Sequence, residues 1–177
     1  MSMEKTSGEQ LREKLFYEPK NGFSRIDQVQ EQAASEYCVE YKHFLNAGKT
    51  ERECVRYAQA MLENAGYKPF QFGNTYKPGD KVYYNNRSRS IIFAIIGKIP
   101  MSQGVNMAAA HIDSPRLDLK PSPVYEDSEL CLFKTHYYGG IKKYQWTAIP
   151  LSLHGVVVKK DGTIVDVCIG EQEDDPV

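Results

Sequence analysis

The sequence predicts an α/β protein in which helices come first, the strands of a mixed sheet follow, and a β-hairpin comes last. Three observations lead to this prediction. Apolar residues recur at spacings of three and four in the first 66 residues, which is the period of a helix. Short segments rich in Val, Ile, Tyr and Phe follow, separated by Gly and Pro, as is typical of strands. Asp161-Gly162 lies between the last two of these segments, and this dipeptide favours a tight hairpin.

The helical part is expected to contain two helices after a short arm. Residues 1–28 begin polar, carry one short amphipathic pattern and are interpreted as a docked arm. Residues 30–46 have the apolar spacing of a helix. A second helix is expected to begin at Thr50, where Thr50 and Glu53 fit a capping box, and to end at Gly66. The apolar face predicted for this helix consists of Cys54, Ala58, Met61, Leu62 and Ala65.

Six later segments have the composition of strands. Residues 81–85 and 90–98 predict a hairpin, because only a short polar turn, expected at 85–88, joins them. Residues 105–111 are mostly small and apolar and predict a buried strand. After a polar turn expected at 124–129, the remaining strands are predicted at 130–138, 151–159 and 163–169.

Composition narrows the classes of protein that this chain can represent. Of 177 residues, 41% are hydrophobic and 25% are charged, which is typical of a soluble globular protein. The net charge of −1 argues against nucleic acid or a membrane surface as a partner. No apolar run is long enough to span a bilayer, and the first residues lack a signal-peptide core, so we expect a cytoplasmic protein. The four cysteines form no C-x-x-C pair and predict free, mostly buried thiols.

The segment that carries chemistry is His111-Ile112-Asp113-Ser114-Pro115, which follows the small apolar run. In an extended chain, residues i and i+2 point to the same side, so His111 and Asp113 should lie together. An imidazole can bind a metal while a neighbouring carboxylate holds the ring. A zinc site needs three or four ligands, and this segment offers at most two. From the spacing alone, His111 and Asp113 could therefore also be a structural or solvated pair.

Residues 110–121, Ala-His-Ile-Asp-Ser-Pro-Arg-Leu-Asp-Leu-Lys-Pro, resemble the His-x-Asp-Ser-Pro segment of the M18 family of zinc metalloaminopeptidases, the aspartyl aminopeptidase family. Residues 81–97 and 137–155, the latter with Tyr-Tyr-Gly-Gly-Ile and Pro-Leu-Ser-Leu-His-Gly, resemble the same family in order and spacing. The resemblance implies that residues 1–147 are the N-terminal part of a mixed-sheet zinc-peptidase catalytic domain. Residues 148–177 would begin an inserted, β-rich dimerisation domain that is incomplete in this chain.

The resemblance also implies an activity. Members of the family remove N-terminal residues from peptides with two zinc ions that activate water, and a separate Glu acts as the general base. His111 matches the first zinc ligand, and Asp113 matches the Asp that orients this ligand. The other ligands and the base would lie beyond Val177, so this chain alone is expected to be inactive. The implied substrate is a peptide with a free N-terminus, with Asp or Glu as one implied preference, and the implied assembly is a homo-oligomer.

Other interpretations of the residues stay open. The chain could be a non-catalytic fragment or an assembly module of the same fold, or it could belong to another co-catalytic zinc hydrolase. Ser114 lacks the Gly-x-Ser-x-Gly setting of a nucleophile. His43 is interpreted as a packed or surface residue. His136 and His154 have no nearby partner at ligand spacing and are interpreted as structural, and the acidic residues of 171–175 as a solvated loop.

Overall fold

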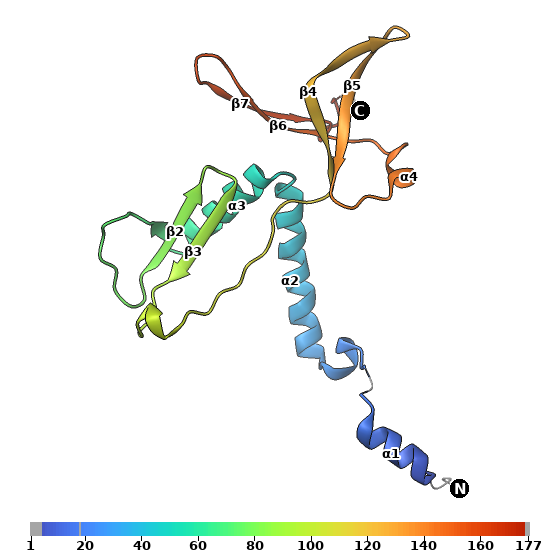
Figure 1. Ribbon diagram of the computed structural model, residues 1–177, viewed down its shortest axis with the longest axis vertical. Helices are drawn as coiled ribbons and strands as arrows, with labels where there is room; N and C mark the ends of the chain where they lie inside the picture. The colour runs from blue at the N-terminus through green and yellow to red at the C-terminus, as the bar shows by residue number, and fades with distance from the viewer. Residues whose placement is uncertain (1–4, 18, 176–177) are drawn as a thin grey trace. The chain divides into compact units, whose positions relative to one another are not determined.

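The computed structural model describes residues 5–17 and 19–175, which belong to two compact units, Met1–His43 and Phe44–Val177 (Figure 1). The first unit contains α1 (Ser7–Leu15), a short 3-10 turn and most of α2 (Gln28–Ala47). The described helices of this unit bury none of their residues. The helix predicted at 30–46 is confirmed. Docking of the arm at 1–28 stays a prediction, and residues 1–4 and 18 of the arm lie outside the described part.

The second unit contains one long helix and three small sheets. The sheets have the orders β1-β2-β3, β4-β5 and β6-β7 (Figure 1). The first sheet is mixed, because β1 pairs with β2 in parallel and β2 pairs with β3 antiparallel, so the predicted α/β class is confirmed. The elements are α3 (Glu51–Asn64), β1 (Lys68–Pro69), β2 (Lys81–Asn86), β3 (Ser90–Ile95), η2 (Met101–Gln103), β4 (Arg116–Asp127), β5 (Leu130–Tyr138), α4 (Lys143–Trp146), β6 (Leu153–Val158) and β7 (Ile164–Ile169).

Helix α3 begins and ends as the sequence predicts. The Thr50 amide donates to the Glu53 carboxylate over 2.8 Å, and the Glu53 amide donates to the Thr50 hydroxyl over 3.3 Å. This capping box satisfies amide groups that have no partner within the helix. Gly66 follows the helix at φ +85°, the left-handed conformation that commonly ends a helix.

The core of this unit lies where α3 packs against β2 and β3. Its buried side chains are those of Cys54, Val55, Leu62, Val82 and Tyr83. The predicted face was therefore wrong at Met61, which is 57% exposed, and at Ala65, which is also exposed, and it omitted Val55, which is 1% exposed. Val55 and Leu62 are seven residues apart, two turns along one line of the helix, and the small sheet covers only a narrow strip around that line.

The hairpins confirm the predicted pairings but differ in their turns. The first turn lies at 86–89, one residue later than expected, with Arg87 and Ser88 both at φ +56°, which is a type I′ turn. In the last hairpin, Lys159 N–H donates to the Thr163 carbonyl over 2.8 Å, and Gly162 has φ +85°. This is a three-residue loop with a glycine bulge, and not the two-residue turn that Asp161-Gly162 predicts.

Two expectations about strands were wrong. Residues 105–111 form no strand and are exposed, because no strand in the described part pairs with their backbone groups. Small apolar composition predicts burial, but burial requires a neighbour. Residues 124–127 belong to β4 and not to a turn, and the turn consists of Ser128 and Glu129 at φ +54° and +65°. Pro121 and Pro123 are the reason that the sequence did not predict this strand. They lie where its pairing register shifts, which is where a strand tolerates proline.

All four cysteines are free, as predicted, but only Cys54 is buried. Cys38, Cys131 and Cys168 are exposed, so the expectation of mostly buried thiols was wrong. The reason is local: Cys131 and Cys168 lie in two-stranded hairpins that no second layer covers within the described residues. Among the helices that the structure describes, none has the length and apolar character needed to cross a bilayer.

Candidate functional site

The structure brings His111 and Asp113 together in the irregular segment that leads into β4. The His111 Nδ1 atom lies 2.9 Å from the Asp113 carbonyl oxygen and 3.4 Å from its carboxylate. Nδ1 is therefore the ring nitrogen that carries the proton, and its N–H group donates a hydrogen bond to Asp113. The ring is 83% exposed, and no contact of its Nε2 atom is seen within the described residues. This arrangement leaves the Nε2 lone pair available to a ligand.

The first turn of α3 holds this segment on both sides of Asp113. On one side, the Cys54 thiol lies 3.7 Å from the Ile112 carbonyl oxygen, within the range of a weak sulfur hydrogen bond. On the other side, the Arg116 guanidinium contacts the Glu51 carboxylate at 2.9 Å. The capped helix therefore gives the His-x-Asp segment a fixed support, although the segment itself is not a strand.

The Asp113 carboxylate is stabilised in its charged form. A hydrogen bond from the Tyr138 hydroxyl is the main cause that lowers the pKa of Asp113, and the charges of His111 and Arg116 contribute to the same effect. The same hydrogen bond raises the pKa of Tyr138. Asp113 is therefore an anion, and Tyr138 a neutral donor, over the physiological pH range.

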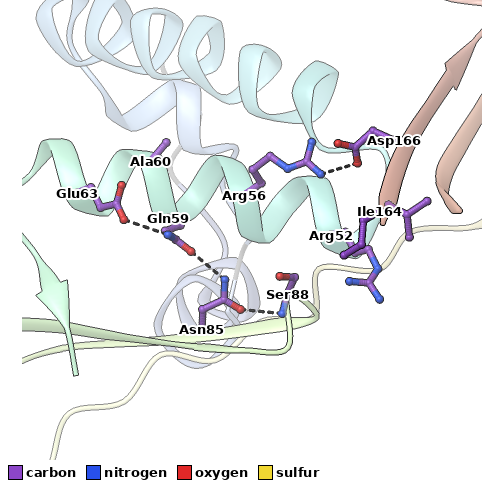
Figure 2. Close-up of a pocket in the computed structure, with 10 residues that line it drawn as sticks. Arg52, Arg56, Gln59, Ala60, Glu63, Asn85, Ser88, Ile164 and Asp166 are labelled. Carbon is purple, nitrogen blue, oxygen red and sulfur yellow. Dashed lines mark hydrogen bonds and ion pairs between the residues drawn. The ribbon is translucent and has the colours of Figure 1, made fainter. Parts of the chain in front are cut away.

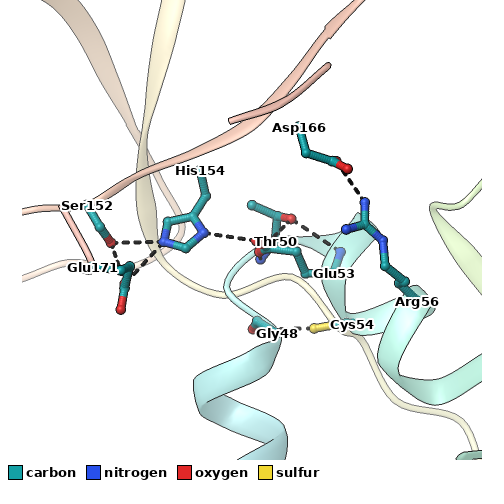
Figure 3. Close-up of polar contacts among 9 residues, drawn as sticks. All are labelled: Gly48, Thr50, Glu53, Cys54, Arg56, Ser152, His154, Asp166 and Glu171. Atoms are coloured by element: carbon teal, nitrogen blue, oxygen red, sulfur yellow. Dashed lines mark hydrogen bonds and ion pairs between the residues drawn. The ribbon is translucent and has the colours of Figure 1, made fainter. Parts of the chain in front are cut away.

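A second polar cluster surrounds His154 (Figure 3). Its Nδ1 atom lies 2.9 Å from the Glu53 carboxylate, and its Nε2 atom lies 3.0 Å from the Ser152 hydroxyl and 3.2 Å from the Glu171 carboxylate. The side chain is only 11% exposed. The structural role predicted for His154 agrees with these contacts. Glu53 is 101 residues away in sequence, so local spacing carried no signal of the pair.

The acidic segment at 171–175 is also more ordered than predicted. Glu171 accepts a hydrogen bond from Ser152 over 2.8 Å, besides its contact with His154. The Asp175 carboxylate accepts from the Gly170 amide over 2.8 Å and from two following amides over 3.2 Å. The segment is a loop whose residues 171–174 are exposed, as interpreted, but these two carboxylates also have partners within the protein. Both carboxylates close the base of the β6–β7 hairpin.

Glu53→Gln is expected to weaken the attachment of the β6–β7 hairpin in a pH-dependent way. Partial burial raises the pKa of Glu53, but hydrogen bonds from His154 and Thr50 outweigh it and leave the pKa below its ordinary 4.5. A lowered pKa means that the charge stabilises the fold above pH 4.5 and that this contribution is lost as the pH falls further. Glutamine keeps the helix cap, so the variant should lose about 1 kcal/mol near pH 7 and less near pH 3.

Urea unfolding of both proteins at pH 7 and pH 3 measures this difference. Glu173→Gln is the matched control, since no contact between Glu173 and His154 is seen among the described residues, and it should change neither value by more than about 0.5 kcal/mol. A Glu53→Gln deficit that is equally large at both pH values would contradict the role assigned to the charge.

A shallow cavity of about 370 Å³ lies between α3, the β2–β3 turn and the β6–β7 hairpin (Figure 2). Arg56 contacts Asp166 in its wall at 2.8 Å, and the Asn85 amide donates to Gln59 over 2.8 Å. These polar groups satisfy one another, and neither His111 nor Asp113 lines the cavity. The cavity is therefore separate from His111, the candidate metal ligand. Its lining is Arg52, Arg56, Gln59, Ala60, Glu63, Asn85, Ser88, Val156, Ile164 and Asp166.

Across residues 5–17 and 19–175, no group of three or more His, Cys, Asp or Glu side chains is arranged to hold a metal ion. The two predicted site residues, His111 and Asp113, do lie together, and the structure adds Tyr138, Arg116 and Glu51 around them. Sequence reasoning missed these three. Arg116 and Tyr138 stand in segments that resemble the family, but nothing in their spacing showed that they meet.

A mixed α/β unit with an exposed imidazole held by a carboxylate fits the class of metal-dependent hydrolases. The family model described as "Aminopeptidase I zinc metalloprotease (M18)" matches residues 44–177. The chain belongs to the M18 family.

Named relatives and solved structures agree. The chain is 50% identical, over 92% of its length, to "Probable M18 family aminopeptidase 1" of Clostridium acetobutylicum, and 44% identical, over 80%, to that of Thermotoga maritima. The crystal structure of aminopeptidase I from Borrelia burgdorferi B31 superposes on 89% of the chain with a TM-score of 0.83 at 43% identity. The chain spans 36% and 31% of the two relatives and 39% of the crystallised chain.

Proposed function

We propose that this chain forms part of a zinc metalloaminopeptidase that removes N-terminal residues from peptides, and that it supplies one metal ligand, His111. The observation that carries the proposal is the His111 ring, whose Nδ1 atom lies 2.9 Å from Asp113 while its Nε2 atom is exposed. Zinc-binding histidines typically donate a hydrogen bond from the N–H of their second ring nitrogen to a carboxylate or carbonyl in this way. Family membership supports zinc as the metal.

The residues present fit zinc but are too few to hold it alone. A zinc-binding site with catalytic activity has three protein ligands and an open position. His111 can supply one, and Asp113 is engaged with the ring and with Tyr138. We therefore propose that the remaining ligands of two zinc ions, and the Glu that acts as general base, lie in the part of the family's sequence that this chain does not span. When bound, the metal would polarise the peptide carbonyl and lower the pKa of water.

The finer features of the activity extend the same proposal. The substrate would be a peptide with an unblocked N-terminus, with Asp or Glu as one preference. Residues 1–147 would belong to the catalytic domain, and residues 148–177 would begin a dimerisation domain that places the enzyme in a homo-oligomer. The scattered free thiols favour a cytoplasmic location.

Zinc analysis of two proteins tests the proposal. The first is the 177-residue chain, which should hold well below one zinc per chain after dialysis. The second, which we call the M18 fusion, joins this chain to the part of the Clostridium acetobutylicum relative outside the match. The M18 fusion should hold about two zinc ions, because the missing ligands are restored, and should cleave N-terminal Asp, Glu or Ala from test peptides.

Each protein can contradict a different part of the proposal. A dialysed 177-residue chain with two zinc ions and peptide turnover would show that its site is complete. A folded M18 fusion without zinc or turnover would favour the alternative, in which this chain is a non-catalytic assembly module.

A further inference from the structure

We infer that His154 is a proton-dependent latch, in which the charged ring holds the β6–β7 hairpin against α3 and the loss of one ring proton releases the hairpin. The latch consists of Glu53 on α3, His154 on β6, and Ser152 and Glu171 at the base of the hairpin (Figure 3). It depends only on contacts within this chain and does not rest on the proposed function.

Three atoms on one side of the ring lie within hydrogen-bond distance of one another. His154 Nε2 lies 3.0 Å from the Ser152 hydroxyl oxygen and 3.2 Å from a Glu171 carboxylate oxygen, and these two oxygens lie 2.8 Å apart. On the other side of the ring, His154 Nδ1 lies 2.9 Å from the Glu53 carboxylate. A carboxylate only accepts hydrogen bonds, so every hydrogen in these contacts comes from the ring or from the hydroxyl.

Only the charged ring supplies enough hydrogens for all of these contacts. An imidazolium donates from Nδ1 to Glu53 and from Nε2 toward Ser152 and Glu171, while the Ser152 hydroxyl donates to Glu171. A neutral ring has one N–H group. If this group is on Nδ1, then Nε2 and the Glu171 carboxylate compete for the single Ser152 hydrogen. If it is on Nε2, two acceptors face each other across 2.9 Å at Glu53.

The neutral ring is therefore unfavourable in this position, whichever nitrogen carries the proton. Both tautomers leave one pair of acceptors in contact. The His154 side chain is only 11% exposed, so little water reaches it to replace the missing donor. A buried polar group without a partner destabilises the arrangement that leaves it so.

The other ionisable groups near the ring keep one charge state between about pH 5.5 and pH 8.5. Hydrogen bonds hold the pKa values of Glu171 and Asp175 low, and they outweigh the partial burial that raises the pKa of Glu53. Desolvation and the neighbouring carboxylates raise the pKa of the Cys168 thiol, which lies opposite His154 in the ladder. Lys49 also attracts Glu171 and is a cation throughout this range. A response in this range therefore comes from His154.

Little else attaches the hairpin to α3. Among the described residues, the buried apolar side chains lie on α3 and β2, and none lies on β6 or β7. Arg56 on α3 contacts Asp166 on β7 at 2.8 Å, but these side chains are 61% and 62% exposed, and exposed pairs contribute little. A two-stranded hairpin is marginally stable by itself. Release from α3 should therefore open the β6–β7 ladder and let its amides exchange with solvent.

The direction of the pH response follows from the charge. The charged ring stabilises the attachment at low pH, and this contribution is lost as the pH rises and the ring becomes neutral. Hydrogen exchange of the β6 and β7 amides of the 177-residue chain, corrected for intrinsic exchange rates, measures it. The protection factors should be at least about fivefold lower at pH 8.5 than at pH 5.5, the low end of the cost of one buried group without a partner. Equal protection at the two pH values would overturn the inference.

Glu171→Gln tests the number of hydrogens directly, because an amide can donate to a neutral ring and a carboxylate cannot. Protection at pH 8.5 should rise in this variant, so that the two pH values differ by less than about twofold. Glu173→Gln is the matched control, since no contact between Glu173 and His154 is seen among the described residues, and it should keep the wild-type ratio. A wild-type ratio in Glu171→Gln would refute the latch.

Two further variants separate the latch from other effects of pH. His154→Gln cannot change its charge, so its protection factors at the two pH values should lie within about twofold of each other. Asp166→Asn removes the other contact with α3 and should keep the wild-type ratio. A fivefold change that persists in His154→Gln would show that another group titrates, and the latch would be wrong. If one of His154→Gln and Glu171→Gln fails to fold, the other decides.

Discussion

His111→Ala is expected to lower the aminopeptidase turnover of the M18 fusion by at least about 100-fold. Loss of an outer partner of a zinc ligand costs about 10- to 100-fold, and loss of the ligand itself should cost more. The fold should be unaffected. The His111 side chain is 83% exposed, and exposed substitutions usually change the free energy of unfolding by less than about 0.5 kcal/mol. The zinc content, the turnover number and the urea midpoint of the variant measure the three effects.

His136→Ala is the matched control for this substitution. His136 is also an exposed histidine, and its ring contacts only the carbonyl oxygen of the following residue at 3.1 Å among the described contacts. It should keep full zinc and full turnover. A His111→Ala fusion that keeps wild-type zinc content and turnover would refute the ligand assignment, and an equal loss in both variants would show that the effect is not specific to the site.

The sequence predicted the parts of the fold that local rules decide. The capping box of Thr50 and Glu53, the stop at Gly66 and the pairing of β2 with β3 all depend on residues close together in the chain. It failed where burial depends on distant neighbours. The apolar segment at 105–111 has the composition of a buried strand, but no strand in the described part of this chain pairs with it. Composition reports what a segment can bury and not whether a neighbour is present.

The candidate site was predictable to the same extent. The proximity of His111 and Asp113 agrees with their spacing of two residues. The contact between Tyr138 and Arg116 does not follow from spacing. These residues meet because β4 and β5 pair, and the prolines of β4 prevented its prediction as a strand. His154 and Glu53 are farther apart still, and only the tertiary fold brings them together. Family resemblance identified the segments, but the contacts between them depend on the tertiary fold.

Leu62→Ala is expected to lower the free energy of unfolding by about 2–5 kcal/mol, the largest loss of stability that we expect from a single substitution in this chain. Leu62 is 8% exposed and lies in the core that α3 forms with β2 and β3. The buried core is small, with Val55, Val82, Tyr83 and Cys54 as its other members, so few side chains can move to fill the space that alanine leaves. Since the total stability of a domain is about 5–15 kcal/mol, this loss is a large fraction of it.

Met61→Ala separates the loss of core packing from the loss of an apolar side chain on the same helix. Met61 is the adjacent residue, is similar in volume and is 57% exposed, so its removal should cost less than about 0.5 kcal/mol. Urea unfolding followed by helical circular dichroism gives both values, with an unchanged slope as the sign that the transition itself is the same. If Met61→Ala proved as costly as Leu62→Ala, the packed strip of α3 would be wider than the line through Val55 and Leu62. The wider face that the sequence predicts, with Met61 in it, would then be right.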